Sequence, residues 1–377
     1  MREEAYSMER GLKKAKPGRM DFGILFVVLL LCAIGLVMVF SASYYSAQEK
    51  IGDSLFYVRK QAIYLALSIP VMFLLTRIDY HVLDKLKTPI LLVCGVLLVA
   101  VLLFGSEYNG AKRWLSIAGQ SIQPSEVAKF GMMIYMSAFM ASRQHLMKDF
   151  FKGLLPMLLV LGIICGLIML QPNMSMAVII GMMGIAMLYV GGADFKYIAL
   201  MMLGGVGLFI LLAVIEPYRY ARLVSFTDPW KDSSGTGYQL IQSLYALGAG
   251  GLFGQGLSNS RQKLLYLTFG ESDFVYSIVG EELGFIGAAV VLLLYLFIVY
   301  RGIRVALKCK DRFGSLLAAG ITIVFALQVA VNVGVVTGVM PTTGQAMPFI
   351  SAGGSSLLIF MSAMGVLLNI SRHTSEL

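Results

Sequence analysis

Ten apolar stretches recur from one end of this chain to the other, and all but the second and fourth, which are short and contain polar residues, are close to the length that crosses a lipid bilayer. A spanning helix needs about 20 mostly apolar residues. Such stretches are predicted at 22–43, 61–76, 88–105, 127–141, 154–171, 174–190, 196–215, 274–300, 314–338 and 350–370. Only 14% of the residues are charged, against about 25% in soluble domains. The sequence therefore predicts an all-α polytopic membrane bundle of about ten transmembrane helices.

Basic residues predict how such a bundle sits in the membrane, because membrane proteins collect Lys and Arg on the cytoplasmic side. If the N-terminus is cytoplasmic and the spans alternate, most basic residues fall on that side, including Arg301, Arg304 and Lys308. Both tails, over 1–20 and 371–377, are therefore predicted in the cytoplasm of a multi-pass cell-membrane protein. The net charge of +9 has the same explanation, so membrane lipids are expected partners and nucleic acid is not.

One long segment, over 216–273, is predicted to lie outside the membrane before the eighth span. It forms the large extracytoplasmic loop of a single domain over 1–377, and its aromatic and apolar residues are not typical of a disordered segment. The glycine-rich run 250–256 superficially resembles a dinucleotide-binding motif, but that signal is weak without a strand before it and a helix after it. We interpret these glycines as tight turns and close backbone packing.

Glu126 and Lys129 are charged residues at the start of a predicted span. Pro124 at a first helical position fixes φ without losing a needed donor, and residues three apart lie on one face of a helix. Charges at bilayer depth are costly unless they pair or face water. The pair is interpreted either as a structural ion pair that locks two helices or as a polar wall for a charged substrate.

Two clusters of basic residues lie outside the predicted spans. Lys112 and Arg113 are followed by Trp114, and adjacent cations beside Trp suit a lipid headgroup or a diphosphate. The alternative is an interfacial anchor, since Trp prefers that depth of the membrane. Arg261 and Lys263 form the second cluster, near the end of the long loop.

Asp273 lies where the long loop meets the eighth span, and Glu281 and Glu282 follow in that span. In a helix these three carboxylates can approach one side, and a partly buried carboxylate is suited to accept a proton. The alternative for Asp273 is a helix N-cap. The uncharged segment 341–356, rich in Pro, Gly and Ser, is predicted to be a broken or re-entrant helix that covers a cavity, with a plain turn as the alternative.

Several short motifs follow one another along the chain. They are Asn109-Gly110 with Arg113-Trp114, Gln123-Pro124-Ser125-Glu126 with Lys129, Gly237-Tyr238-Gln239 with Gln242-Ser243, Gly250-Gly251-Leu252-Phe253-Gly254, Gln262-Lys263, Asp273-Phe274, Gly280-Glu281-Glu282-Leu283-Gly284, Pro341-Thr342-Thr343-Gly344 and Gly353-Gly354-Ser355-Ser356. With ten spans and a long loop before the eighth, they closely resemble the SEDS family (FtsW, RodA and SpoVE), the polytopic peptidoglycan polymerases of division, elongation and sporulation. The chain is more similar to the FtsW/SpoVE branch, which indicates a role in cell division.

The resemblance implies a glycosyltransferase that polymerises lipid II, a disaccharide pentapeptide on undecaprenyl diphosphate, into glycan strands. It implies as partners a class B penicillin-binding protein, the transpeptidase that cross-links these strands, and other division proteins at the septum. The family's essential aspartate maps onto Asp273, and its intramembrane Glu and Lys map onto Glu126 and Lys129. The sequence departs from the family pattern at Leu267-Thr268-Phe269, Asn173 and Ala352.

Glycosyl transfer from a lipid diphosphate is the predicted chemistry. Asp273 is the expected general base, which deprotonates the 4-hydroxyl of the acceptor GlcNAc so that its oxygen attacks C1 of the donor MurNAc with inversion. Positive charge has to stabilise the leaving diphosphate, supplied by basic residues or by a divalent cation such as Mg²⁺ or Mn²⁺. No cofactor is certain, because the cysteines and histidines form no metal motif. Glu126 and Lys129 complete the catalytic set, and the residues expected to bind substrate are Lys112, Arg113, Arg261, Lys263, Glu281, Glu282 and Ser355.

Two other functions would use the same features. A flippase would move lipid II across the bilayer through the same polar cavity, since intramembrane charges and broken helices also fit transport. A non-catalytic division scaffold would only bind other proteins. A flippase moves labelled lipid II between leaflets without lengthening glycans, and a scaffold tolerates Asp273→Ala and Lys129→Ala.

Overall fold

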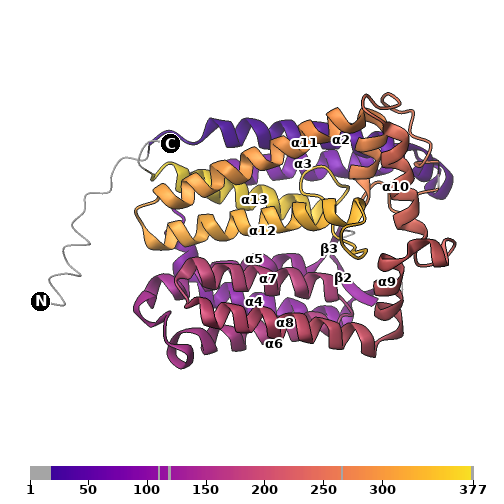
Figure 1. Ribbon diagram of the computed structural model, residues 1–377. Helices are drawn as coiled ribbons and strands as arrows, with labels where there is room; N and C mark the ends of the chain where they lie inside the picture. The colour runs from indigo at the N-terminus through magenta and orange to yellow at the C-terminus, as the bar shows by residue number, and fades with distance from the viewer. Residues whose placement is uncertain (1–17, 109–110, 118–119, 265, 375–377) are drawn as a thin grey trace, which may run out of the picture.

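The computed structural model describes residues 18–108, 111–117, 120–264 and 266–374. Most of the two predicted tails and the Asn109-Gly110 motif therefore lie outside the described residues. The long helices run side by side, and the segment that follows the seventh span crosses one end of the bundle (Figure 1).

The described elements follow one another in a simple order. They are α2 (Phe22–Ile51), α3 (Phe56–Leu75), α4 (His81–Phe104), β1 (Ser106–Tyr108), β2 (Ala111–Ile117), β3 (Gln120–Ile122), α5 (Pro124–Ser142), η1 (Gln144–Leu146), η2 (Phe150–Leu154), α6 (Leu155–Met169), α7 (Met174–Gly191), α8 (Phe195–Ile215), α9 (Pro217–Thr227), η3 (Pro229–Asp232), α10 (Tyr238–Gly250), α11 (Val275–Lys308), α12 (Arg312–Val336) and α13 (Gly354–Ser371). The strands form a small antiparallel sheet in the order β1-β2-β3.

Among the residues that the structure describes, nine helices are long and apolar enough to cross a membrane. They are α2, α3, α4, α6 with the preceding η2, α7, α8, α11, α12 and α13. The tenth predicted span corresponds to α5, which carries Glu126 and Lys129 and has most of its residues buried. Protein surrounds α5 where lipid would be unfavourable for charge. The predicted all-α membrane bundle is confirmed.

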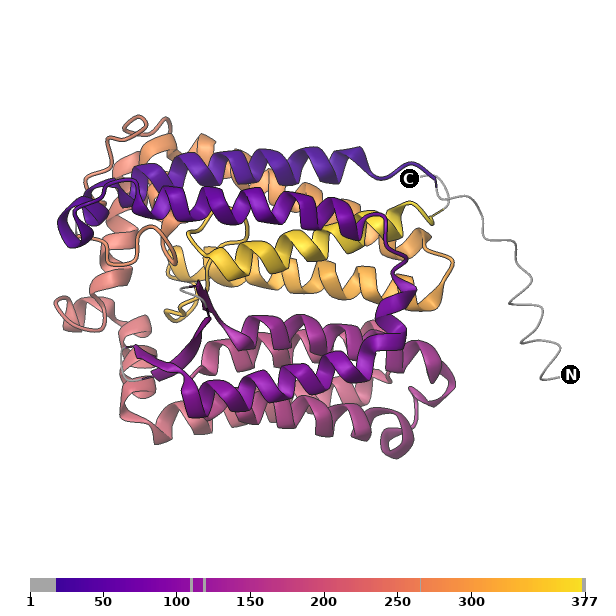
Figure 2. The ribbon, with the colours of Figure 1, turned by 180° about the vertical axis from the view of Figure 1, so that it is seen from behind.

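The central helix of the bundle is α12. In the most apolar stretch of each span, 67% of the residues of α12 and of α13 are buried in protein, against 11% of those of α8. α12 packs on α11 and α13 and also on α5 and α7. It therefore joins two groups of helices that both views separate, with α2, α3, α11 and α13 in one group and α4 to α8 in the other (Figures 1 and 2).

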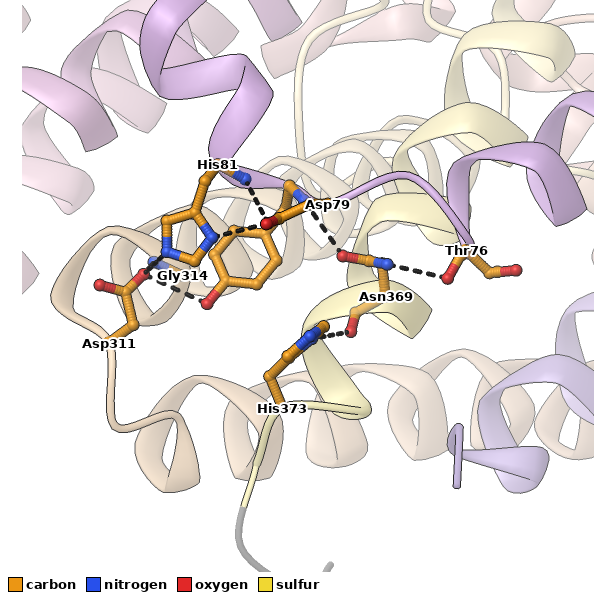
Figure 3. Close-up of polar contacts among 8 residues, drawn as sticks. Thr76, Asp79, His81, Asp311, Gly314, Asn369 and His373 are labelled. Atoms are coloured by element: carbon orange, nitrogen blue, oxygen red, sulfur yellow. Dashed lines mark hydrogen bonds and ion pairs between the residues drawn. The ribbon is translucent and has the colours of Figure 1, made fainter. Parts of the chain in front are cut away.

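Polar side chains join neighbouring turns at the end of the bundle where the chain enters α2 and leaves α13 (Figure 3). The Asp311 carboxylate caps α12 by accepting a hydrogen bond from the Gly314 N–H at 2.7 Å, and it accepts another from the Tyr80 hydroxyl at 3.2 Å. A ring nitrogen of His81 lies 3.3 Å from the same carboxylate. The start of α12 is thereby attached to the turn between α3 and α4.

Asn369 attaches α13 to the same turn. Its Nδ2 donates to the carbonyl of Thr76 at 2.8 Å, and its Oδ1 accepts from the Tyr80 N–H at 3.2 Å (Figure 3). At the start of α2, Asp21 caps the helix and pairs with Arg301 of α11 at 2.7 Å. These contacts fix the register of several long helices at one end of the bundle, and hence the positions of their other ends.

At the opposite end, α11 breaks at Gly284, whose φ of 69° and ψ of −173° are not helical. The break releases backbone groups that lipid cannot satisfy, and the glycine turn (250–256) supplies their partners. The Gln255 N–H donates to the Glu281 carbonyl at 2.9 Å, and the Phe285 N–H donates to a carbonyl of the glycine turn at 2.8 Å. The interpretation of these glycines as tight turns with close backbone packing is confirmed.

The last loop, between α12 and α13, dips into the bundle. Phe349 and Ile350 are almost completely buried. The Tyr295 hydroxyl donates to the Pro348 carbonyl, and a Cβ on Gly35 of α2 would lie 2.3 Å from the Phe349 oxygen. Residues 341–353 contain turns and no helix, so the predicted broken helix is not found there, but their burial fits a re-entrant loop rather than a plain surface turn. The cavity that the segment was expected to cover stays a prediction.

We expect Gly284→Ala to lower the thermal stability of the protein in detergent. A Cβ at this position would lie 2.3 Å from the Gly254 nitrogen, and a side chain in this backbone region costs about 1–3 kcal/mol. Gly166→Ala in α6 is the matched control, because nothing lies within 4 Å of its Cβ. Unfolding followed by circular dichroism should show a lower midpoint for Gly284→Ala alone. Equal midpoints for the two variants would contradict the tight contact between α11 and the glycine turn.

Candidate active site

Glu126 and Lys129 form a buried ion pair in the first turn of α5. Lys129 Nζ lies 2.9 Å from Glu126 Oε2, and the two side chains are 0% and 6% exposed. The same nitrogen donates to Gln328 Oε1 of α12 at 3.0 Å and lies 5.0 Å from the centroid of the Phe360 ring on α13. The pair therefore ties α5 to α12 and α13.

Of the two interpretations of this pair, the structural one accounts for the contacts. The Lys129 ammonium is completely enclosed and already bonded to two side-chain oxygens. A leaving diphosphate could reach it only if α5 and α12 separated. A direct catalytic role for Glu126 or Lys129 stays a prediction.

Asp273 lies in the last turn of the long loop, just before α11 begins at Val275. Its N–H donates to the Phe269 carbonyl at 3.1 Å, and its own carbonyl accepts from Asn332 Nδ2 of α12 at 2.8 Å. A Cβ on Gly344 would lie 3.3 Å from Asp273 Oδ2, so the carboxylate rests against the re-entrant loop.

The alternative that Asp273 is an N-cap does not fit this geometry. The capping position of α11 is Phe274, and no side chain caps the helix with a hydrogen bond. The Asp273 carboxylate instead faces the backbone at Gly344, where the absent side chain leaves room beside it. The carboxylate therefore does not serve as the cap of α11, and its catalytic role stays a prediction.

Burial, together with the neighbouring carboxylate of Glu271, raises the pKa of Asp273 to about 7, and the Arg222 guanidinium opposes part of this shift. Burial also raises the pKa of Glu271 above its usual range. A carboxyl group whose pKa lies near neutral pH is an effective general base. The electrostatics of the site therefore support the role predicted for Asp273.

Arg222 is the basic residue whose charge acts on Asp273, and the sequence did not single it out. It lies on α9, and its Nη1 donates to the Thr342 carbonyl of the re-entrant loop at 3.2 Å. The two residues are far apart in the sequence, so no spacing pattern connects them. Their proximity depends on α9 folding back across the end of the bundle (Figure 1).

Glu281 and Glu282 hold the long loop against α11. Glu282 Oε1 accepts from Lys263 Nζ at 3.0 Å and from the Ser41 hydroxyl of α2 at 2.6 Å. Glu281 Oε1 accepts from the backbone N–H of Arg261 at 2.9 Å. Lys263, Glu281 and Glu282 are buried. The described hydrogen bonds of Glu281 and Glu282 go to the long loop and to α2, and substrate binding by Lys263, Glu281 and Glu282 stays a prediction.

The remaining residues expected to bind substrate occupy three other places. Lys112 is exposed on β2, and the side chain of Arg261 is exposed on the long loop. Arg113 donates to the carbonyls of Gln171 and Pro172 in the turn between α6 and α7, so it holds that turn. Ser355 is buried in the first turn of α13. Substrate binding by these residues stays a prediction.

The departures from the family pattern have structural roles. Asn173 caps α7 by accepting from the Met176 N–H at 3.4 Å, a position at which Asn and Asp are equally favoured. The Thr268 hydroxyl accepts from Gln239 Nε2 of α10 at 2.9 Å. The Ala352 N–H donates to the Glu271 carbonyl at 2.8 Å. This bond joins two backbone groups, so it does not depend on which side chain stands at residue 352.

A divalent cation was one of two predicted sources of positive charge. Among the described residues, no group of three or more His, Cys, Asp or Glu side chains could hold a metal ion. The carboxylates of Glu271 and Asp273 alone are too few for a protein-bound metal centre. The residues present do not fit a resident metal, and a cation that arrives with the substrate stays a prediction.

The fold and the site define a polytopic membrane protein with a half-buried carboxylate at one end of the bundle, between a re-entrant loop and a central helix. The model of the FtsW, RodA and SpoVE family, described as cell cycle proteins, matches residues 22–376. The chain belongs to this family.

Relatives and solved structures agree with this assignment over almost the full chain. The chain is 40% identical to stage V sporulation protein E of Bacillus subtilis, over 96% of this chain and 99% of that one. It is 40% identical to a probable peptidoglycan glycosyltransferase FtsW of Geobacter sp. strain M18, over 93% and 96%.

Two solved structures have the same fold. One is a chain from work on the structural coordination of polymerization and crosslinking by a peptidoglycan synthase complex. It matches with a TM-score of 0.77 and 29% identity, over 94% of this chain and 98% of that one. The rod shape determining protein RodA of Thermus thermophilus matches with a TM-score of 0.70 and 26% identity, over 95% and 98%.

We expect Lys129→Met to destabilise the protein by about 3–5 kcal/mol, because it leaves the Glu126 carboxylate buried without its partner. The double variant Glu126→Gln with Lys129→Met should recover most of this stability, since neither charge then remains buried. Thermal unfolding in detergent measures both. A double variant no more stable than Lys129→Met would show that the ion pair is not the reason for the loss.

Proposed function

We propose that this protein is a peptidoglycan glycosyltransferase that polymerises lipid II, with Asp273 as its general base. The observation that carries the proposal is the Asp273 carboxylate, whose pKa is raised to about 7 by burial at the end of the bundle. Its relatives are named peptidoglycan glycosyltransferases, and this chain has the same membrane fold with a base and a cation at one site.

The proposed reaction is a single displacement at C1 of the donor MurNAc. Asp273 takes the proton from the 4-hydroxyl of the acceptor GlcNAc, and the oxygen forms a bond to C1 as the C1–O bond to the diphosphate breaks. The donor link is α and the new glycan link is β, so the configuration inverts. The base contributes about 10²–10⁴-fold to the rate.

Arg222 is the residue we assign to the leaving diphosphate. A guanidinium carries five N–H donors in a planar fork that matches phosphate oxygens, so it can hold the Thr342 carbonyl and still bind an anion. Its distance from Asp273 is short enough for its charge to act on that carboxylate. Lys129 and Lys263 are bonded to buried carboxylates, whereas the charge of Arg222 acts on Asp273 itself, which makes it the candidate we choose.

The proposed setting is the cell membrane, with both termini in the cytoplasm and Asp273 at the extracytoplasmic end. Basic residues near the terminal end of the bundle, such as Arg301, Arg304 and Lys308, support this orientation. The proposed partner is a class B penicillin-binding protein at the division septum. The similarity to a chain of a peptidoglycan synthase complex with polymerization and crosslinking supports a transpeptidase partner.

We expect Asp273→Asn to abolish glycan synthesis without unfolding the protein. The amide keeps the shape of the carboxylate but cannot accept the proton. The measurement is gel analysis of glycan strands made from purified lipid II, with and without the cognate transpeptidase, for the variant and the wild type purified in parallel.

Three outcomes of this experiment distinguish the functions. Glycan strands from Asp273→Asn at the wild-type rate would refute the base role. A wild-type protein that transfers labelled lipid II between leaflets of a vesicle and makes no glycan would be a flippase. A wild-type protein that does neither, even with the transpeptidase, would be a scaffold.

The pH dependence of the reaction should follow the two charges beside Asp273. The base must be ionised, so kcat/KM should rise with pH through a midpoint near 7. Glu271→Gln removes a like charge, lowers the pKa of Asp273 and moves the midpoint to lower pH. Arg222→Gln removes an opposite charge, raises that pKa and moves the midpoint to higher pH.

The matched control is Arg304→Gln, which changes the same charge on α11 near the other end of the bundle and should leave the midpoint in place. The readout is the position of the midpoint rather than the maximal rate, because Arg222→Gln also weakens diphosphate binding. Identical midpoints in Glu271→Gln, Arg222→Gln and the wild type would show that the titration of Asp273 does not set the pH dependence of the reaction.

A further inference from the structure

A chain of hydrogen bonds inside the bundle connects the buried ion pair to the re-entrant loop. Lys129 Nζ donates to Gln328 Oε1 at 3.0 Å. Gln328 Nε2 in turn donates to Gln345 Oε1 at 3.1 Å and to the Ala346 carbonyl at 3.0 Å. Gln328 is completely buried, and Gln345 is 3% exposed. The ion pair on α5 is thus connected through α12 to the loop that lies beside Asp273.

One turn further along α12, Asn332 completes the connection. Its Nδ2 donates to the Gln345 carbonyl and to the Asp273 carbonyl, both at 2.8 Å. Residues four apart lie on the same face of a helix, so Gln328 and Asn332 point toward the same loop. Gln328 therefore holds the side chain of Gln345, and Asn332 holds its backbone carbonyl.

These two amides are not required for α12 to pack. A buried amide is favourable only when its hydrogen bonds are made, and an apolar residue in a membrane span would avoid that requirement. Here the two amide nitrogens donate to the re-entrant loop and to Asp273, while Gln328 Oε1 accepts from Lys129 of α5 and Asn332 Oδ1 has no hydrogen-bond partner among the described residues. The two amides therefore fix the position of the backbone at Gln345 and Ala346 in the re-entrant loop and at Asp273.

Asp273 depends on this connection because it is not held as a helix cap. Its N–H is bonded to the Phe269 carbonyl within the loop, and its carbonyl is held by Asn332. Without Asn332, the described contacts of the Asp273 backbone all belong to the loop itself. A displacement of about 1 Å at a catalytic group can cost on the order of 10²-fold in rate.

We propose that Gln328 and Asn332 are positioning residues that act as one unit, placing Asp273 at a fixed distance from the Glu126–Lys129 pair. This inference rests on the proposed function, in which Asp273 is the general base. It assigns to α12 the task of holding the base, and it gives a reason for the hydrogen-bond chain that joins the buried ion pair to the backbone of Asp273.

The test removes the hydrogen bonds of each amide by replacing it with an apolar side chain of similar size. The two variants are Asn332→Leu and Gln328→Met. For each variant we expect kcat for glycan synthesis from lipid II to fall on the order of 10²-fold, with KM little changed, because substrate binding is left intact. The double variant should lose no more than the more damaging single one, since residues that act as one unit are not additive.

Asn369→Leu is the matched control. Asn369 is an equally buried amide, 2% exposed against 1% for Asn332. It also bonds backbone groups of a neighbouring turn, but at the opposite end of the bundle (Figure 3). It should lower thermal stability as Asn332→Leu does and leave kcat unchanged, and its effects should add to those of Gln328→Met without coupling.

Each result decides the inference. A folded Asn332→Leu with the kcat of the wild type would overturn it, as would a double variant whose losses multiply or an equal fall of kcat in Asn369→Leu. If Asn332→Leu does not fold, it is replaced by Asn332→Asp, whose carboxylate keeps the shape of the amide and loses both N–H donors. The kcat of Asn332→Asp and of Gln328→Met then tests the inference. An active Asp273→Asn would defeat the proposed function, whereas an inactive Asp273→Asn with a fully active Asn332→Leu would defeat only this inference.

Discussion

Backbone groups released inside the membrane-spanning bundle need partners from the protein, because lipid offers none. This requirement governs both places where the helical ladder is interrupted. The glycine turn satisfies the break of α11 at Gly284, and buried side chains of α12 satisfy the re-entrant loop. The re-entrant loop lies beside Asp273, and the same Asn332 amide holds both backbones, so contacts that stabilise the fold also place the Asp273 carboxylate.

The charges of the site divide into those that hold the structure and those left for chemistry. Lys129 and Lys263 are each enclosed with a carboxylate, which neutralises them within the protein. Asp273 has no such ion pair among the described residues, and its carboxylate rests beside Gly344. A like charge on Glu271 and an opposite charge on Arg222 tune its pKa in opposite directions, which keeps the group close to the midpoint of its titration.

The sequence predicted what depends on local pattern. Apolar length located the spans, including α5, whose polar residues made it the least apolar of them. Pro, Gly and Ser density located the re-entrant loop, and position in the chain pointed to Asp273. Contacts between distant segments were not predictable from spacing, which is why Arg222 and Asn332 were missed and the ion pair of Lys263 with Glu282 was not foreseen. Polar residues such as Gln328 and Asn332 inside an apolar span were the available signal.

Both ends of α12 are tied to turns rather than left in lipid. Asp311 fixes its start through Gly314 and Tyr80, and Gln328 and Asn332 fix its last turns. A helix of 25 residues is roughly 38 Å long and resists compression along its axis. A displacement of the Asp311 turn along the helix axis is therefore expected to reach the carbonyl of Asp273 at the opposite end of the bundle.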